Sequence, residues 1–66
     1  MKLKDLKKGE YFCLRPHGEQ EVSAKQVYIK GEYNRQLKRY EISRADDINY
    51  IRYLKGCTDI YLDFIF

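Results

Sequence analysis

Aromatic and branched residues alternate with charged residues along the C-terminal two thirds of this 66-residue chain, and this pattern constrains its fold more than any other feature. The chain has seven tyrosines and no tryptophan, and six of the tyrosines lie in this region among basic side chains. Such alternation favours half-buried, pleated strands. Basic groups between aromatic rings are also what a nucleic-acid-binding surface uses. The pattern therefore predicts an all-β protein and permits nucleic-acid binding.

The length of the chain limits what it can do. Sixty-six residues are enough for one small domain, which we expect to span residues 1–66. A chain this short buries only roughly 60% of the surface that its unfolded form exposes, so its core is small. A water-excluded catalytic cavity would occupy much of that core. We therefore expect a binding protein and not an enzyme.

No apolar run suits a signal peptide or a membrane span, which predicts a cytoplasmic protein without membrane association. Cys13 and Cys57 are then expected to be free thiols, because the cytosol is reducing. Cys13 and His17 have a spacing that occurs in metal sites. A structural zinc site needs four Cys or His ligands, however, and the chain has three. We predict no metal and no cofactor.

The first part of the chain indicates a turn followed by a strand. Leu3 and Leu6 fit one face of a single helical or 3₁₀ turn, which Gly9 can end in a left-handed conformation. Residues 10–15 are then predicted to form a strand, stopped by a tight turn at residues 15–18. The polar stretch that follows is predicted to be a loop.

A hairpin over residues 26–44 is the clearest element of the sequence. Its first strand, residues 26–33, alternates so that Val27, Ile29 and Tyr33 form an inner face and Tyr28, Lys30 and Glu32 an outer one. Gly31 interrupts the inner face, where glycine marks a bulge or a close backbone approach. Residues 34–37 form the predicted loop, and residues 38–44 return with Tyr40 and Ile42 facing inward.

The remaining residues leave one choice open. Residues 45–56 contain signals of a short helix and of a strand, and we favour a turn at 46–51 followed by a strand at 52–55. The last strand, residues 60–66, alternates regularly and is predicted to lie inside the sheet. Five short strands with at most one short helical turn predict a small SH3-like barrel, because closure satisfies the strand edges. An open sheet that dimerises is the alternative.

Four strings of the chain resemble a known family: Leu-Lys-Lys-Gly-Glu-Tyr-Phe (residues 6–12), Ile-Lys-Gly-Glu-Tyr-Asn-Arg (29–35), Ala-Asp-Asp-Ile-Asn (45–49) and Leu-Lys-Gly-Cys-Thr-Asp-Ile-Tyr-Leu-Asp-Phe (54–64). They are similar to a group of small uncharacterised bacterial all-β proteins that are often carried on mobile elements. The resemblance covers most of the chain and implies a β-barrel. It supplies no catalytic or binding residues.

The tyrosines and basic residues around the hairpin support one functional hypothesis. We expect a nucleic-acid-binding surface on the outside of the barrel, where rings stack on bases and cations meet phosphates. A formal net charge of +3 is compatible with it. The candidate residues are Tyr28, Lys30, Arg35, Lys38, Arg39 and Arg44.

Protein recognition is the competing hypothesis. SH3-like barrels bind peptides in aromatic grooves, and tyrosine is enriched at interfaces. Glu32 and Glu41 lie on the same predicted surface, where they repel phosphate and suit a protein partner better. Self-association into a homodimer is one form of this hypothesis. Salt distinguishes the two, because nucleic-acid binding weakens steeply as salt rises.

Overall fold

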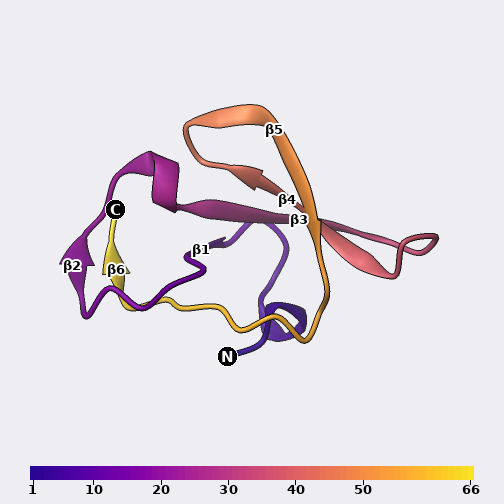
Figure 1. The fold of residues 1–66 in the computed structure, drawn as a ribbon, viewed down its shortest axis with the longest axis horizontal. Coiled ribbons are helices and arrows are strands. Elements are labelled where there is room, and N and C mark those ends of the chain that lie inside the picture. The colour runs from indigo at the N-terminus through magenta and orange to yellow at the C-terminus, as the bar shows by residue number, and fades with distance from the viewer.

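One antiparallel sheet runs across the centre of the fold (Figure 1), in a computed structural model that describes residues 1–66. Four strands form this main sheet in the order β1-β3-β4-β5. Their bounds are Tyr11–Phe12 for β1, Tyr28–Asn34 for β3, Arg39–Arg44 for β4 and Asp47–Leu54 for β5. The chain has no α-helix, and the all-β prediction is confirmed.

Two short parallel strands form a second sheet beside the C-terminus, at the left of Figure 1. Here β2 (Gln20–Glu21) pairs with β6 (Phe64–Ile65). Two 3₁₀ helices complete the fold, η1 (Leu3–Asp5) and η2 (Ala24–Gln26), and no helix is long and apolar enough to cross a membrane. The predicted N-terminal turn corresponds to η1, and Gly9 after it has the expected positive φ of 88°.

The predicted hairpin forms the centre of the main sheet, with β3 and β4 joined by a turn at residues 35–38. The register of the pair shifts between Lys30 and Tyr33, as expected for a bulge. Gly31 lies at this bulge, and a Cβ atom there would be 2.9 Å from the carbonyl oxygen of Glu41. Glycine therefore allows the two backbones to approach closely.

The bulge also reverses which side chains of β3 face the core. Residues directly opposite each other on paired strands share a face of the sheet. Lys30 lies opposite Ile42, which is completely buried, so Lys30 and Tyr28 are on the core face and Ile29 is on the other. The predicted faces of Tyr28, Ile29 and Lys30 are therefore wrong, because the alternation in the sequence continues unbroken through the bulge. Val27, which precedes β3, is completely buried, as predicted.

The hydrophobic core lies between one face of the main sheet and the segments that cross it. Tyr28, Tyr40 and Leu54 are partly buried and pack against its centre. This places Tyr40 and Ile42 inward, as predicted. The buried centre consists of Leu3, Leu6, Phe12, Ile42 and Ile60.

The main sheet does not close on itself. Strands β1 and β5 are its two edges, and no hydrogen-bonded pairing joins them. The predicted five-stranded SH3-like barrel is therefore not confirmed. Strands β2 and β6 make a separate sheet and do not extend the main one.

The C-terminal segment does not form the continuous inner strand that its alternation predicts. Regular pairing is confined to β6, and before it Tyr61 forms an isolated bridge with Cys13. Ile60 is buried as predicted, whereas Leu62 and Phe66 are exposed. Figure 1 shows the segment running from the end of β5 past β1 towards β2. The alternation over residues 60–66 therefore corresponds to a regular strand only at β6.

Strand β5 is longer than predicted and irregular. A turn over residues 46–51 is favoured by the sequence, but the strand already begins at Asp47. Ser43 of β4 lies opposite Ile51, and the next residue of β4 pairs with Asp47. Residues 48–50 therefore arch away from β4, as the upper part of Figure 1 shows.

The face of the main sheet opposite the core carries several exposed apolar side chains, together with Ser43 and Glu41. Tyr11, Ile29, Ser43 and Ile51 are successive cross-strand neighbours in one row across this face. Tyr11 is 44% exposed, Ile51 48%, and Tyr53, which lies on the same face, 38%. We call Tyr11, Ile29, Ser43, Ile51 and Tyr53 the outer sheet face.

Candidate functional site

The tip of the β3–β4 hairpin carries three of the predicted nucleic-acid-binding residues, Arg35, Lys38 and Arg39. It projects from the body of the fold at the right of Figure 1. All three side chains are exposed, and none forms an ion pair. Residues 33–40 contain no carboxylate. This segment, which we call the basic arm, therefore presents three uncompensated positive charges.

Local interactions give the basic arm a defined shape. The side-chain oxygen of Asn34 accepts a hydrogen bond from the backbone N–H of Leu37 at 3.0 Å. Lys38 has a left-handed backbone conformation, with φ of 55°, where the turn joins β4. At the base of the arm, the rings of Tyr33 and Tyr40 pack edge to face with centroids 4.9 Å apart. The arm is thus an ordered two-stranded ribbon.

Lys30 does not lie on an exposed surface, and its predicted placement on the outer face is wrong. The residue is only 5% exposed. Its ammonium group donates a hydrogen bond to the carbonyl oxygen of Leu6 and lies 4.2 Å from the centroid of the Tyr40 ring. Burial lowers the pKa of Lys30, because desolvation disfavours the charged form, and nearby Asp5 partly opposes this effect. Lys30 therefore connects the N-terminal turn to the sheet.

Arg44 is held by its own neighbours in the chain. Its Nε donates a hydrogen bond to Asp46 Oδ1 at 2.6 Å. Its guanidinium group also lies 4.5 Å from the centroid of the Tyr50 ring. A phosphate at this position would compete with the Asp46 carboxylate, so Arg44 is a weaker candidate contact than the residues of the arm.

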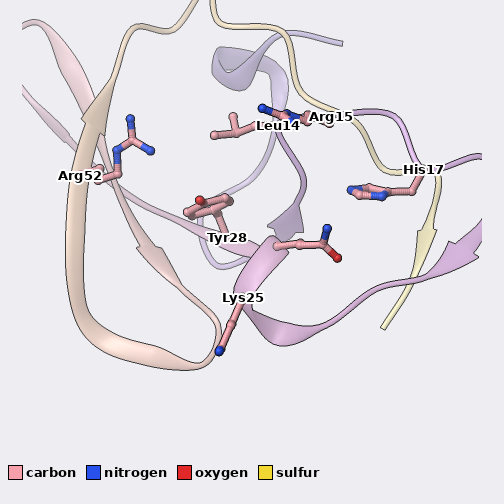
Figure 2. Close-up of a pocket in the computed structure, with 7 residues that line it drawn as sticks. Leu14, Arg15, His17, Lys25, Tyr28 and Arg52 are labelled. Atoms are coloured by element: carbon pink, nitrogen blue, oxygen red, sulfur yellow. The ribbon is translucent and has the colours of Figure 1, made fainter.

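Tyr28, the sixth predicted residue, lines a hollow beside the core face of the sheet (Figure 2). The hollow has a volume of about 330 Å³. Residues from the loop after β1, from η2, from β3 and from β5 surround it. Its polar lining consists of Arg15, His17, Lys25, Gln26, Tyr28 and Arg52.

The hollow is lined by cations and by no carboxylate. Arg15, Lys25 and Arg52 take part in none of the ion pairs of the chain. Asp63 lies near His17 but accepts hydrogen bonds from the backbone N–H groups of Gly18, at 2.9 Å, and of His17, at 3.3 Å. These bonds, with that of Gly18 the strongest, lower the pKa of Asp63. The Asp63 carboxylate therefore faces the loop and leaves the charge of the hollow positive.

Sequence reasoning misses most of this hollow. Arg15 and Lys25 belong to segments predicted to be a turn and a loop, and Arg52 is one basic residue among many. The pairing of β1 with β3, of β3 with β4 and of β4 with β5 places their segments around the hollow. No local pattern in the sequence predicts this strand pairing, so the sequence contains no signal from which the hollow could be predicted.

The reactive side chains of the chain include two free cysteines. No group of three or more His, Cys, Asp or Glu residues is placed to hold a metal ion. Cys13 is buried, and its burial raises the pKa of the thiol, which keeps it protonated and unreactive. Cys57 is a free, exposed thiol. The basic arm and the hollow instead carry cations that take part in none of the ion pairs.

Comparison with known proteins reveals no relative. No family model matches the chain, and no curated protein or solved structure is significantly similar to it. The resemblance to small bacterial all-β proteins stays a prediction.

Proposed function

We propose that the protein is a nucleic-acid-binding module that contacts the phosphate backbone through the basic arm. The observation that carries this proposal is the group of three exposed, unpaired cations, Arg35, Lys38 and Arg39, on a projecting ribbon without carboxylates. Phosphate contacts supply most of the affinity of such interfaces. A two-stranded β-ribbon also fits the major groove of duplex DNA.

The charges elsewhere on the surface support the choice of the arm. Lys2 pairs with Asp59 at 2.6 Å, and Lys8 pairs with Glu32 at 2.5 Å. Such lysines already have a negative partner, so a phosphate gains less by approaching them. The arm combines full exposure, three charges within five residues and no competing acid. An exposed Leu37 between the cations adds an apolar contact to sugars or bases.

Fluorescence anisotropy with labelled single-stranded and duplex oligonucleotides tests this proposal. The variant combines Arg35→Gln, Lys38→Gln and Arg39→Gln. For a duplex, each phosphate contact contributes about 0.9 to the slope of log affinity against log salt, so we expect the slope to fall by about 2.7. The affinity at low salt should fall with it.

A matched control removes three charges elsewhere. Lys4→Gln, Lys7→Gln and Lys55→Gln change exposed lysines without ion pairs, and lower the net charge by the same amount. We expect this variant to bind nearly as tightly as the wild type. Equal weakening by both variants indicates unspecific attraction by net charge and contradicts a defined interface on the arm.

A second candidate function, recognition of a protein or of a second copy of the chain, is favoured by the outer sheet face. Tyr11, Ile51 and Tyr53 leave much of their apolar area exposed there. Surfaces of this kind mark interaction sites when they are contiguous. Sedimentation of the wild type and of Ile51→Asp tests self-association. A concentration-dependent dimer that the substitution dissociates supports self-association, and a wild-type monomer contradicts it.

A further inference from the structure

Three cationic residues line the hollow from different parts of the chain, Arg15 from the loop after β1, Lys25 from η2 and Arg52 from β5. Figure 2 shows the guanidinium groups of Arg15 and Arg52 on one side of the Tyr28 ring, whereas the Lys25 ammonium group points away from them. None of them has a carboxylate partner, although other basic residues of the chain do. Like charges around a common space repel each other, and an anion bound between them removes this repulsion. The hollow therefore favours an anionic ligand.

Uncharged donors add to this preference. The backbone N–H of Ser23 donates to Gln26 Oε1 at 3.4 Å, within a capping box at the start of η2. Because that oxygen is engaged, the NH₂ group of Gln26 is the part of the amide left for the hollow. His17 offers a further ring N–H. A lining that is rich in donors suits a phosphate group, whose oxygens accept hydrogen bonds.

Tyr28 gives the hollow an aromatic wall. Its ring is half-buried and packs against Phe12, with centroids 6.0 Å apart, which fixes its position. Figure 2 shows the ring at the centre of the hollow. Nucleobases stack on such rings. With about 330 Å³, the hollow lies at the lower end of the range of ligand pockets, roughly 300–1,000 Å³, and fits a ligand about as large as one nucleotide.

We propose that the hollow binds a phosphomonoester joined to a flat ring, the chemistry of a nucleoside 5′-monophosphate. The phosphate lies on the side of Arg15 and Arg52, and the base lies against Tyr28. A phosphomonoester carries about 1.5–2 negative charges at neutral pH, which matches several cations better than the single charge of an internal phosphodiester. This site is separate from the basic arm and does not depend on its role.

Isothermal titration calorimetry on the full chain at low salt tests the proposal with adenosine 5′-monophosphate, adenosine and orthophosphate. We expect the monophosphate to bind, orthophosphate to bind more weakly and adenosine not to bind. Arg52→Gln should weaken binding of the monophosphate about tenfold or more, because a charge-assisted hydrogen bond is lost. The matched control Lys55→Gln removes an exposed cation three residues further on, outside the hollow, and should leave the affinity unchanged.

Three results of this experiment overturn the proposal. The first is the absence of any binding of the monophosphate at millimolar concentration. The second is binding of adenosine as tight as that of the monophosphate. The third is equal weakening by Arg52→Gln and Lys55→Gln.

Competition with oligonucleotides identifies the source of the phosphomonoester. Displacement of the monophosphate by a 5′-phosphorylated strand, and not by its 5′-hydroxyl counterpart, supports binding of a strand end. Failure of both strands to displace it supports binding of the free mononucleotide. Equal displacement by both strands shows that internal phosphodiesters suffice, and this contradicts a phosphomonoester site.

Discussion

Replacing Gly31 by alanine should destabilise the protein through one atomic contact. The added Cβ would lie 2.9 Å from the carbonyl oxygen of Glu41 and 3.5 Å from its carbonyl carbon. This oxygen belongs to the backbone of β4, so the overlap is relieved only when β3 and β4 move apart and their hydrogen bonds lengthen. Gly31 has no positive φ, so the alanine backbone itself adds no strain.

The magnitude follows from two opposing effects of Gly31→Ala. Overpacking of this kind costs about 1–3 kcal/mol. Alanine also restricts the unfolded chain, which stabilises the fold by about 0.4–1 kcal/mol. We expect a net loss of about 1–2 kcal/mol. A chain of this length has a total stability of about 3–10 kcal/mol, so the loss is readily measured.

Urea unfolding followed by circular dichroism measures the effect. Gly56→Ala is the matched control, because its Cβ would meet side-chain atoms, Tyr40 Cε2 at 3.1 Å and Lys4 Cβ at 3.2 Å. The Tyr40 ring can shift by a few tenths of an ångström, whereas Lys4 Cβ moves only with its backbone. Both contacts are longer than the 2.9 Å contact at Gly31, so we expect a smaller loss at Gly56. A Gly31→Ala variant as stable as the wild type, or more stable, refutes the close approach of the strands at the bulge.

Three further substitutions separate the roles of buried and charged residues. Two backbone N–H groups lower the pKa of Asp63, so its carboxylate stabilises the fold at neutral pH, and this contribution disappears as the pH falls below about 4. The variant Asp63→Asn should therefore lose less stability than the wild type when the pH falls below about 4. An equal loss of stability in both proteins contradicts this role of the Asp63 carboxylate. Burial lowers the pKa of Lys30, so the unfolded chain binds this proton more tightly than the folded chain, and the stability of the wild type rises as the pH approaches about 10. The variant Lys30→Met should lose this rise in stability and keep the nucleic-acid affinity of the wild type. A loss of affinity would place Lys30 at the interface. Ile42→Ala should cost about 2–5 kcal/mol in thermal unfolding, because Ile42 is completely buried. Ile51→Ala, on the outer sheet face, should cost much less, and similar losses contradict the assignment of the two faces.

Local signals in the sequence predict the elements that depend on neighbouring residues. The hairpin, its loop and the N-terminal turn follow from alternation and from turn-forming residues, and the structure confirms them. The N-terminal turn η1 ends at Asp5, however, and Gly9 has its positive φ in a separate turn after it. The basic arm can be predicted for the same reason, because Arg35, Lys38 and Arg39 are close together in the sequence. Their role in binding stays a prediction.

The failures of sequence reasoning arise where distant segments decide the structure. The face of Lys30 depends on a one-residue shift at the bulge, which inverts the alternation that precedes it. Closure of a barrel depends on whether β1 reaches β5, and no local pattern determines that. The hollow is lined by residues of separate elements, among them Arg15, Lys25 and Arg52. Sheet pairing brings them together, and it is not visible in any one stretch of the chain.

The position of the nucleic-acid interface is tested most directly by a titration of the ¹⁵N-labelled protein with a short duplex, followed through its backbone amide resonances. We predict that amides of residues 34–39 shift first and most, and that added salt reverses the shifts. Shifts confined to the outer sheet face or to the hollow, with the arm unaffected, would contradict the proposal that the basic arm binds nucleic acid.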